Sequence, residues 1–238
     1  MNKRIRCLDA LRGGAVFLMV LHHGAYSYKF IFGGRIDLYT PFLGIGVLFV
    51  ALFFSISGVS SHLSRNNLTR GIKALAVAAV ISIATFLFDI YISSGSFVAF
   101  GVIHGLGSCM IIYHFIGKYT DRLFGKITPL VYAALFILFY IITRDPVSIP
   151  HLYPLGFYDA NFASSDYYPI LPWIFMFFFG GSLSNSIISN KFPKWFYALE
   201  FRPLEWIGRN ALAVYVIHQP IIYLLLFAIS RIYPAFFS

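Results

Sequence analysis

Apolar residues along the chain fall into seven long runs that short polar stretches separate. Each run is close to the length of about 20 residues that an α-helix needs to cross the hydrocarbon core of a bilayer. The pattern predicts an all-α polytopic membrane protein, a bundle of about seven transmembrane helices in a single domain over residues 1–238. The runs cover residues 11–31, 41–63, 72–92, 97–117, 127–143, 169–188 and 206–230, of which the fifth is the shortest.

The first apolar run follows a polar start and carries two histidines inside it. In a helix, the eleven residues from Arg12 to His23 make three turns plus about 20°, with about 16 Å of rise. Asp9 falls about 40° to the other side of His23. Asp9, Arg12 and His23 therefore share one stripe, and an i,i+3 ion pair is expected between Asp9 and Arg12. His22 points about 80° away from this stripe.

The composition supports a membrane protein. Hydrophobic residues make up 59% of the chain, charged residues make up 11%, and the mean hydropathy is +0.77, whereas soluble domains carry about 25% charge. The net charge of +9 is explained by basic residues in the cytoplasmic loops of a membrane protein, so it does not indicate nucleic-acid binding. Cys7 and Cys109 give no disulfide framework. The first run is too long for a signal peptide and has no cleavage site, so we expect an uncleaved helix.

The basic residues predict an orientation. With the N-terminus inside, fourteen of the 18 Lys and Arg residues lie on the inner side, as the positive-inside rule requires. We therefore expect a cytoplasmic N-terminus and an extracytoplasmic C-terminus, which needs an odd number of spans. The longest loop, residues 144–168, then lies outside. It is rich in Pro, Tyr and Asp, which predicts an ordered functional loop. The four outer basic residues are Lys29, Arg35, Arg144 and Arg231.

Five ionisable residues lie inside the predicted spans, namely His22, His23, Asp89, His104 and His218. Such residues are costly in a membrane and mark a functional site by default. A single histidine can also be a neutral ring that joins two helices. His23 and His218 both lie about twelve residues from the cytoplasmic end of their spans, which is similar depth. A neutral imidazole at a dry site can act as a general base or nucleophile, so His23, His218 and His104 are the catalytic candidates.

The motifs of several other site types are missing from the sequence. No His-x-x-x-His pair occurs, and no cysteine or carboxylate stands at ligand spacing from a histidine, so no metal site is expected. The chain also lacks a Gly-x-Ser-x-Gly elbow, a P-loop and a Gly-x-Gly-x-x-Gly motif. These absences exclude the enzyme classes that depend on those motifs.

The last apolar run carries further polar groups. Pro220 cannot donate a backbone hydrogen bond, so it predicts a kink that turns His218 and Gln219 towards the bundle interior. Arg209, at the start of the run, has two interpretations. It is either an anchor on the cytoplasmic side, or it forms with Arg12 a basic site at the cytoplasmic surface that binds a phosphorylated cofactor.

Four sequence blocks resemble a known family. The first, Leu8-Asp9-Ala-Leu-Arg12-Gly13 with Met19 and a histidine four residues later, resembles the opening of the heparan-α-glucosaminide N-acetyltransferase-like transmembrane acyltransferases. Three later blocks resemble those of bacterial members in the same order. They are Phe100-Gly101-Val-Ile-His104, then Asp166-Tyr-Tyr-Pro169-Ile-Leu-Pro172-Trp173, and then Ile207-Gly208-Arg209-Asn210 through Tyr215 to His218-Gln219-Pro220.

The resemblance implies an enzyme of the bacterial cytoplasmic membrane that transfers an acetyl group from cytoplasmic acetyl-CoA to an extracytoplasmic amino sugar or glycan. The polar position of the family's first span matches His23. By the same analogy, basic residues at the inner mouth hold the CoA phosphates, which suggests Arg12 and Arg209, with Asp9 holding Arg12 in place. The lysosomal enzyme has a catalytic histidine in the next loop, where this chain has Gly33-Gly34-Arg35. If the chemistry is retained, His23, His104 or His218 must take the catalytic role of that loop histidine.

The expected acceptor contacts are Asp166 and Tyr167 of the outer loop, together with Asn210 and Gln219. Aromatic faces and a carboxylate suit a sugar amine or hydroxyl. The implied partners are acetyl-CoA, the sugar or glycan and membrane lipid, without nucleic acid, and a homodimer is left open. The rival hypothesis is a transporter or channel whose histidines form a proton relay. Transporters usually show repeated halves, and the sequence shows no such repeat.

Overall fold

The computed structural model describes residues 5–92, 95–147, 149 and 151–237, and this part of the chain is helical and has no β-strand. It forms two compact units. Unit 1 contains residues 1–53 and 192–238, and unit 2 contains residues 54–191. One helix, α2 (Gly46–Leu63), passes from the first unit to the second. The all-α prediction is therefore confirmed.

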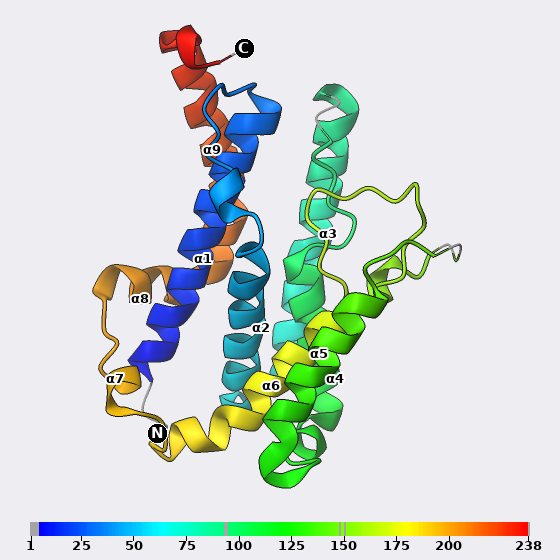
Figure 1. The fold of residues 1–238 in the computed structure, drawn as a ribbon, viewed down its shortest axis with the longest axis vertical. Coiled ribbons are helices and arrows are strands. Elements are labelled where there is room, and N and C mark those ends of the chain that lie inside the picture. The colour runs from blue at the N-terminus through cyan, green and yellow to red at the C-terminus, as the bar shows by residue number, and fades with distance from the viewer. Residues whose placement is uncertain (1–4, 93–94, 148, 150, 238) are drawn as a thin grey trace. The chain divides into compact units, whose positions relative to one another are not determined.

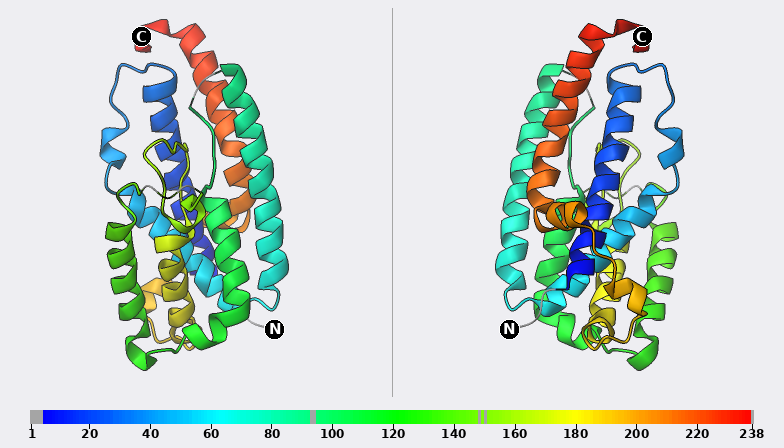
Figure 2. Two further views of the ribbon diagram at one scale, coloured as in Figure 1. Left: turned by 90° about the vertical axis from the view of Figure 1, so that its right-hand side faces the viewer. Right: turned by 90° about the vertical axis from the view of Figure 1, so that its left-hand side faces the viewer.

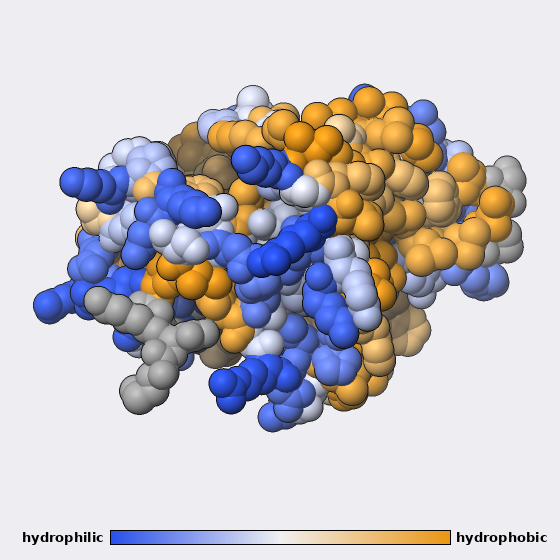
Figure 3. Space-filling view, turned by 90° about the horizontal axis from the view of Figure 1, so that it is seen from below, coloured by the Kyte–Doolittle hydropathy of each residue, from blue (hydrophilic) through white to orange (hydrophobic). Residues whose placement is uncertain are grey.

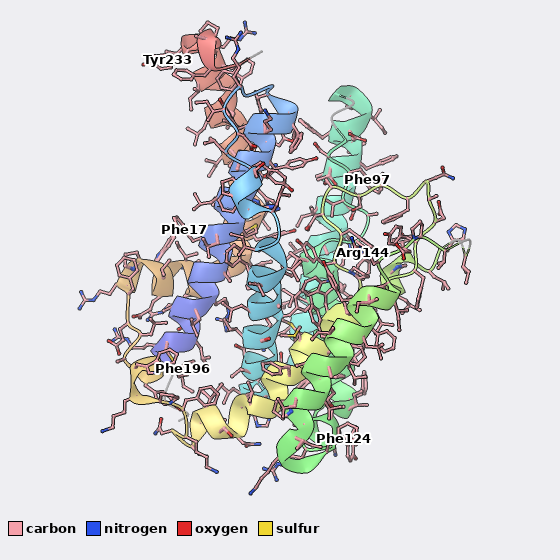
Figure 4. The ribbon with its side chains drawn as sticks, in the orientation of Figure 1. Phe17, Phe97, Phe124, Arg144, Phe196 and Tyr233 are labelled. Carbon is pink, nitrogen blue, oxygen red and sulfur yellow. The ribbon has the colours of Figure 1, made fainter. Side chains whose placement is uncertain are left out.

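Unit 1 is built around α1 (Arg6–Tyr26), which is one continuous α-helix. Figure 1 shows α8 lying across α1, whereas α9 follows the length of α1 (Figure 2). Phe196 and Tyr233, labelled in Figure 4, mark the two ends of this unit. Its other elements are η1 (Ser27–Ile31), η2 (Thr40–Phe42), α7 (Lys194–Tyr197), α8 (Arg202–Arg209), α9 (Ala211–Ile232) and η5 (Pro234–Phe236).

The helices α1 and α9 run in the same direction. His23 of α1 contacts His218 of α9, and the next residue of α1, Gly24, faces Ile222, which is one turn further along α9. Beyond the helix, the backbone of Gly34 forms an isolated antiparallel bridge with Phe237. Residue numbers therefore rise together along both helices. If both cross the membrane, this shared direction requires the odd number of spans that the basic residues predict.

The crossing of α1 and α8 depends on two glycines. A Cβ atom at Gly13 would lie 1.8 Å from the carbonyl oxygen of Leu204, and one at Gly208 would lie 1.9 Å from the carbonyl oxygen of Asp9. These distances are shorter than any non-bonded contact, so the two backbones meet only where both side chains are missing. The close approach fixes the register of α8 on α1.

Unit 2 contains two antiparallel helix pairs, α3 with α4 and α5 with α6. Aromatic rings fill its interior, where Trp173 contacts Phe54 and Phe136, and Tyr113 contacts Phe177. Phe124 and Arg144, labelled in Figure 4, stand before and after α5. The helices are α3 (Asn67–Ile92), α4 (Val102–Thr120), α5 (Thr128–Ile142) and α6 (Ile170–Ile188), with the short turns η3 (Gly125–Ile127) and η4 (Tyr153–Leu155).

Five of the described helices are long and apolar enough to cross a membrane, namely α2, α3, α5 with its preceding turn, α6 and α9. Only 11% of the apolar window of α3, α5 and α9 is buried, as expected of lipid-facing helices. Figure 3 shows broad hydrophobic areas beside groups of hydrophilic residues. The helices α1 and α4 have sufficient length, but their charged and histidine side chains make them less apolar. Seven spans and their orientation therefore stay a prediction.

Two predicted element boundaries were wrong. The last run does not form one helix from residue 206, because the chain bends at Asn210, where φ is −107° and ψ is 22°. Trp206 belongs to α8, and α9 begins only at Ala211. The fourth run is not helical before Val102. Ala99 instead donates its backbone N–H to the hydroxyl of Ser164, and Val102, the first residue of α4, donates its own to Oδ2 of Asp166.

The glycine contact between α1 and α8 predicts opposite effects for two neighbouring substitutions. Gly13→Ala should destabilise the protein by about 1–3 kcal/mol, because its methyl group overlaps the backbone of α8. Gly14→Ala is the matched control, since its Cβ would be 3.9 Å from the nearest atom, in Leu204. This control should stabilise α1 by up to about 1 kcal/mol through helix propensity. Thermal unfolding in detergent measures both, and equal effects would contradict the contact.

Candidate functional site

A pair of histidines joins α1 to α9 in unit 1. Nδ1 of His23 lies 2.8 Å from Nε2 of His218. The two rings are stacked, with centroids 5.0 Å apart and an angle of 21° between their planes. His218 is buried, whereas His23 is partly exposed. The structure thus brings together two of the three histidines that the sequence predicted as catalytic candidates.

The hydrogen bonds of the pair determine where its protons lie. Nδ1 of His218 faces the backbone carbonyl of Tyr215 at 2.5 Å. A carbonyl oxygen can only accept, so Nδ1 of His218 carries the proton, and the Nε2 of a neutral ring must then accept. The proton between the rings therefore belongs to Nδ1 of His23. Nε2 of His23 is left with a lone pair, and it has no hydrogen-bond partner among the described residues.

Gln219 supports the same junction from the neighbouring position in α9. Its Nε2 donates to the hydroxyl of Ser27, which is fully buried, at 3.0 Å. Its Oε1 is buried and lacks a hydrogen-bond partner within the described part of the chain. Gln219 thus ties α9 to the end of α1, next to the histidine pair.

A second polar group, at the start of α1, consists of alternating acids and arginines. Asp9 contacts Nη1 of Arg12 at 3.2 Å and Nε of Arg209 at 3.7 Å. Glu205 contacts Nη2 of Arg209 at 3.0 Å and Nε of Arg6 at 3.4 Å. The pair predicted between Asp9 and Arg12 is present, and the structure brings Arg12 and Arg209 together on one carboxylate. We call these five residues the arginine–carboxylate cluster.

Burial explains why this cluster is so tightly linked. Asp9 is 5% exposed and Glu205 only 2%, and a carboxylate removed from water is costly unless cations and hydrogen bonds compensate it. Each of the two acids faces two arginines, which provides that compensation. Glu205 was missed by the sequence analysis. Its position four residues before Arg209, the spacing of a helical ion pair, is the signal that could have identified it.

Asn210 lies at the bend between α8 and α9, where its Nδ2 donates to the carbonyl of Trp206 at 2.9 Å. It precedes His218 by eight residues, which is about 12 Å along a helix. The side chain is therefore placed at the level of the arginine–carboxylate cluster and stabilises the end of α8.

His104 of unit 2 uses both ring nitrogens in local structure. Nδ1 accepts the N–H of Gly101 at 3.1 Å and so caps the start of α4, while Nε2 faces the hydroxyl of Ser82 at 3.3 Å. A ring with both nitrogens engaged can take up a proton only by giving up one of these bonds. The geometry therefore favours a structural role for His104 over its predicted catalytic one.

Asp166 and Tyr167 hold the outer loop of unit 2 in place. Oδ2 of Asp166 accepts the N–H of Val102 at 3.0 Å, at the first turn of α4. The hydroxyl of Tyr167 donates to the carbonyl of Tyr153 at 2.7 Å, and burial raises the pKa of this phenol. These bonds order the described end of the loop around Asp166 and Tyr167. These bonds connect it to its own unit, and acceptor binding by the two residues stays a prediction.

Unit 2 also contains a polar cluster that the sequence analysis missed. Nδ1 of His62 lies 2.5 Å from Oδ2 of Asp121, and the hydroxyl of Tyr113 donates to the same oxygen at 2.5 Å. His62 and Asp121 are 59 residues apart, so no local spacing indicates their contact. Among the described residues, no group of three or more His, Cys, Asp or Glu side chains could hold a metal ion.

Helices that are long and apolar enough to cross a membrane, together with ionisable side chains paired between helices, are the features of an integral membrane protein. The model of the family described as "Heparan-alpha-glucosaminide N-acetyltransferase, catalytic" matches residues 4–220. The chain therefore belongs to this family of membrane acetyltransferases, and the resemblance of its sequence blocks is confirmed. The match extends over both units. No curated protein and no solved structure was found to match the chain.

The arginine–carboxylate cluster predicts unequal effects of neutralising Glu205, which belongs to it, and Glu200, which contacts Arg6 from outside it. Glu205→Gln should destabilise the protein by about 1–3 kcal/mol, because a buried acceptor for two arginines loses its charge. Glu200→Gln is the matched control, since Glu200 contacts Arg6 at 2.8 Å but is half exposed. An exposed ion pair contributes less than about 1 kcal/mol. Thermal unfolding compares the two, and a larger effect at Glu200 would contradict the assignment.

Proposed function

We propose that the protein transfers an acetyl group from cytoplasmic acetyl-CoA to an amino sugar or glycan hydroxyl on the extracytoplasmic side. The observation that carries this proposal is the 2.8 Å contact between His23 and His218, which leaves the lone pair of Nε2 of His23 without a hydrogen-bond partner among the described residues and so able to accept a proton. A general base at the reacting amine or hydroxyl is what acyl transfer from a thioester requires.

The reaction proceeds by attack of the acceptor nitrogen or oxygen on the thioester carbonyl. Nε2 of His23 removes the proton of the attacking atom as the new bond to the carbonyl carbon forms. The carbon–sulfur bond then breaks, the electron pair leaves with sulfur, and the proton on His23 passes to the CoA thiolate. Acetylated acceptor and free CoA are released, and His23 returns to its neutral form.

His218 positions the base and stabilises its charge. When Nε2 of His23 takes up a proton, the imidazolium donates through Nδ1 to the lone pair of His218. The carbonyl of Tyr215 holds His218 in the tautomer that can accept this bond. His218 thus has the role that an orienting residue has beside a general base in other acyl-transfer enzymes.

The arginine–carboxylate cluster is the proposed site for the CoA phosphates. Arg209 uses Nε on Asp9 and Nη2 on Glu205, and a guanidinium has five N–H donors, so Nη1 of Arg209 is left for an anion. Arg12 lies beside it on α1. Because α1 is a continuous helix, about 16 Å separates Arg12 from His23 along its axis. An extended pantetheine arm of that length would bring the thioester to the base.

Removal of the base should slow transfer strongly. With labelled acetyl-CoA and glucosamine, purified His23→Ala should lose about 10²–10⁴-fold in kcat, the usual contribution of a general base. His218→Ala should also lose activity, with less effect on the binding of acetyl-CoA. The matched control is His114→Ala, which removes an exposed histidine of α4 and should leave kcat unchanged.

The same preparation tests the rival function. If wild-type protein forms no acetylated product but carries protons across the membrane of sealed vesicles, the transferase is excluded and the relay hypothesis is supported. If His23→Ala retains transfer at nearly the wild-type rate, His23 is not the base.

A further inference from the structure

We infer that the acceptor sugar binds to an aromatic cluster beside the histidine pair, with Tyr39 as its stacking surface and His22 as its polar contact. This inference rests on the proposed function and assigns the acceptor subsite to unit 1. The cluster comprises His22 and Tyr26 of α1, Phe30 of η1, and Tyr39 and Phe42 at η2. We call it the Tyr39 cluster.

Tyr39 is the centre of this cluster. Its ring centroid lies 5.3 Å from that of His22, 5.7 Å from that of Tyr26 and 5.2 Å from that of Phe30. The contacts with Tyr26 and Phe30 are edge-to-face, with interplanar angles of 70° and 83°, a preferred geometry of aromatic pairs. Three rings from α1 and η1 therefore hold the ring of Tyr39 in place, and it is still partly exposed.

His22 connects the cluster to the proposed base. Its ring centroid is 5.6 Å from that of His23 and 6.0 Å from that of Phe42. It is half-buried, and its ring nitrogens have no hydrogen-bond partner among the described residues. A neutral imidazole offers one donor and one acceptor. His22 can thus bind two sugar hydroxyls, or a hydroxyl and the amine, within one residue of His23.

A carboxylate completes the subsite. Asp37 accepts the backbone N–H of Tyr39 at 3.1 Å and that of Thr40 at 3.0 Å, and also the hydroxyl of Thr40 at 2.5 Å. These bonds lower the pKa of Asp37, so it is ionised at neutral pH. Its side chain is exposed and tied to the backbone of Tyr39. An aromatic face and a carboxylate on the same segment suit an amino sugar, which has an apolar ring face and hydroxyl and neutral amine groups that donate hydrogen bonds to a carboxylate.

The outer loop of unit 2 is a weaker candidate for the same role. Asp166 and Tyr167 use their polar atoms on Val102 and Tyr153, whereas the ring nitrogens of His22 are unengaged. A belt of tyrosines at the membrane interface is the other explanation for the Tyr39 cluster. That explanation requires neither an unengaged histidine nor convergence of several rings on one tyrosine.

The test separates acceptor binding from donor binding and from catalysis. Tyr39→Ala should raise the KM for glucosamine about tenfold, as expected for loss of one favourable aromatic contact, and leave the KM for acetyl-CoA within about twofold of wild type. Tyr39→Phe keeps the ring and should behave as wild type. The matched control is Tyr233→Ala, which removes an exposed ring of unit 1 that contacts only Phe236 among the described rings.

A second variant keeps the test valid if Tyr39→Ala fails to fold. His22→Phe retains a ring against Tyr39 and Phe42 and removes both nitrogens. It should raise the KM for glucosamine about tenfold, as expected for one lost hydrogen bond, without lowering the thermal stability. An unchanged KM for glucosamine in a folded variant, or an equal rise in the KM for acetyl-CoA, overturns the inference.

The inference and the proposed function fail in distinguishable ways. Absence of acetyl transfer by the wild-type protein would remove the proposed function. Transfer that depends on His23 but is indifferent to His22 and Tyr39 would remove only the acceptor subsite. Magnetisation transfer from His23→Ala protein to glucosamine detects binding without turnover. This signal should disappear in the double variant with Tyr39→Ala, and its persistence would contradict the subsite.

Discussion

The close approach of α1 and α8 at Gly13 and Gly208 is the constraint on which unit 1 depends. Only glycines allow the two backbones to meet, and this contact places α8 at one register on α1. Arg209, one residue after Gly208, is thereby brought to Asp9. The bend at Asn210 then starts α9 in the direction of α1, so that His218 comes level with His23. A backbone contact between two small residues thus determines both the arginine–carboxylate cluster and the histidine pair.

The second constraint is the cost of polar groups in an apolar helical protein, and each unit meets it with contacts from its own residues. In unit 1, Asp9 and Glu205 are each surrounded by two arginines. In unit 2, His104 and Asp166 cap the start of α4 through backbone N–H groups. Residues of the same type therefore have different roles in the two units. A histidine with both nitrogens engaged stabilises a helix, and one with a free nitrogen is available for chemistry.

The sequence predicted the features that depend on local periodicity. The helical runs and the pairing of Asp9 with Arg12 follow from spacing and composition within one segment. The contact of His23 with His218 was only suggested by similar depth, because it also requires α1 and α9 to be parallel and adjacent. The burial of Glu205 and the rings around Tyr39 depend on tertiary contacts. No pattern within a single segment encodes them.

The carbonyl of Tyr215 closes one end of the histidine pair. A series of histidines that conducts protons needs an entrance and an exit. Each ring must accept a proton on one nitrogen and release a proton from the other. Here the outermost nitrogen of His218 donates to an oxygen that cannot carry the proton further. A proton that reaches Nε2 of His23 must leave by the same atom. The pair therefore behaves as a reversible store for one proton, which suits a single transfer between two bound reactants and does not suit transport across a membrane.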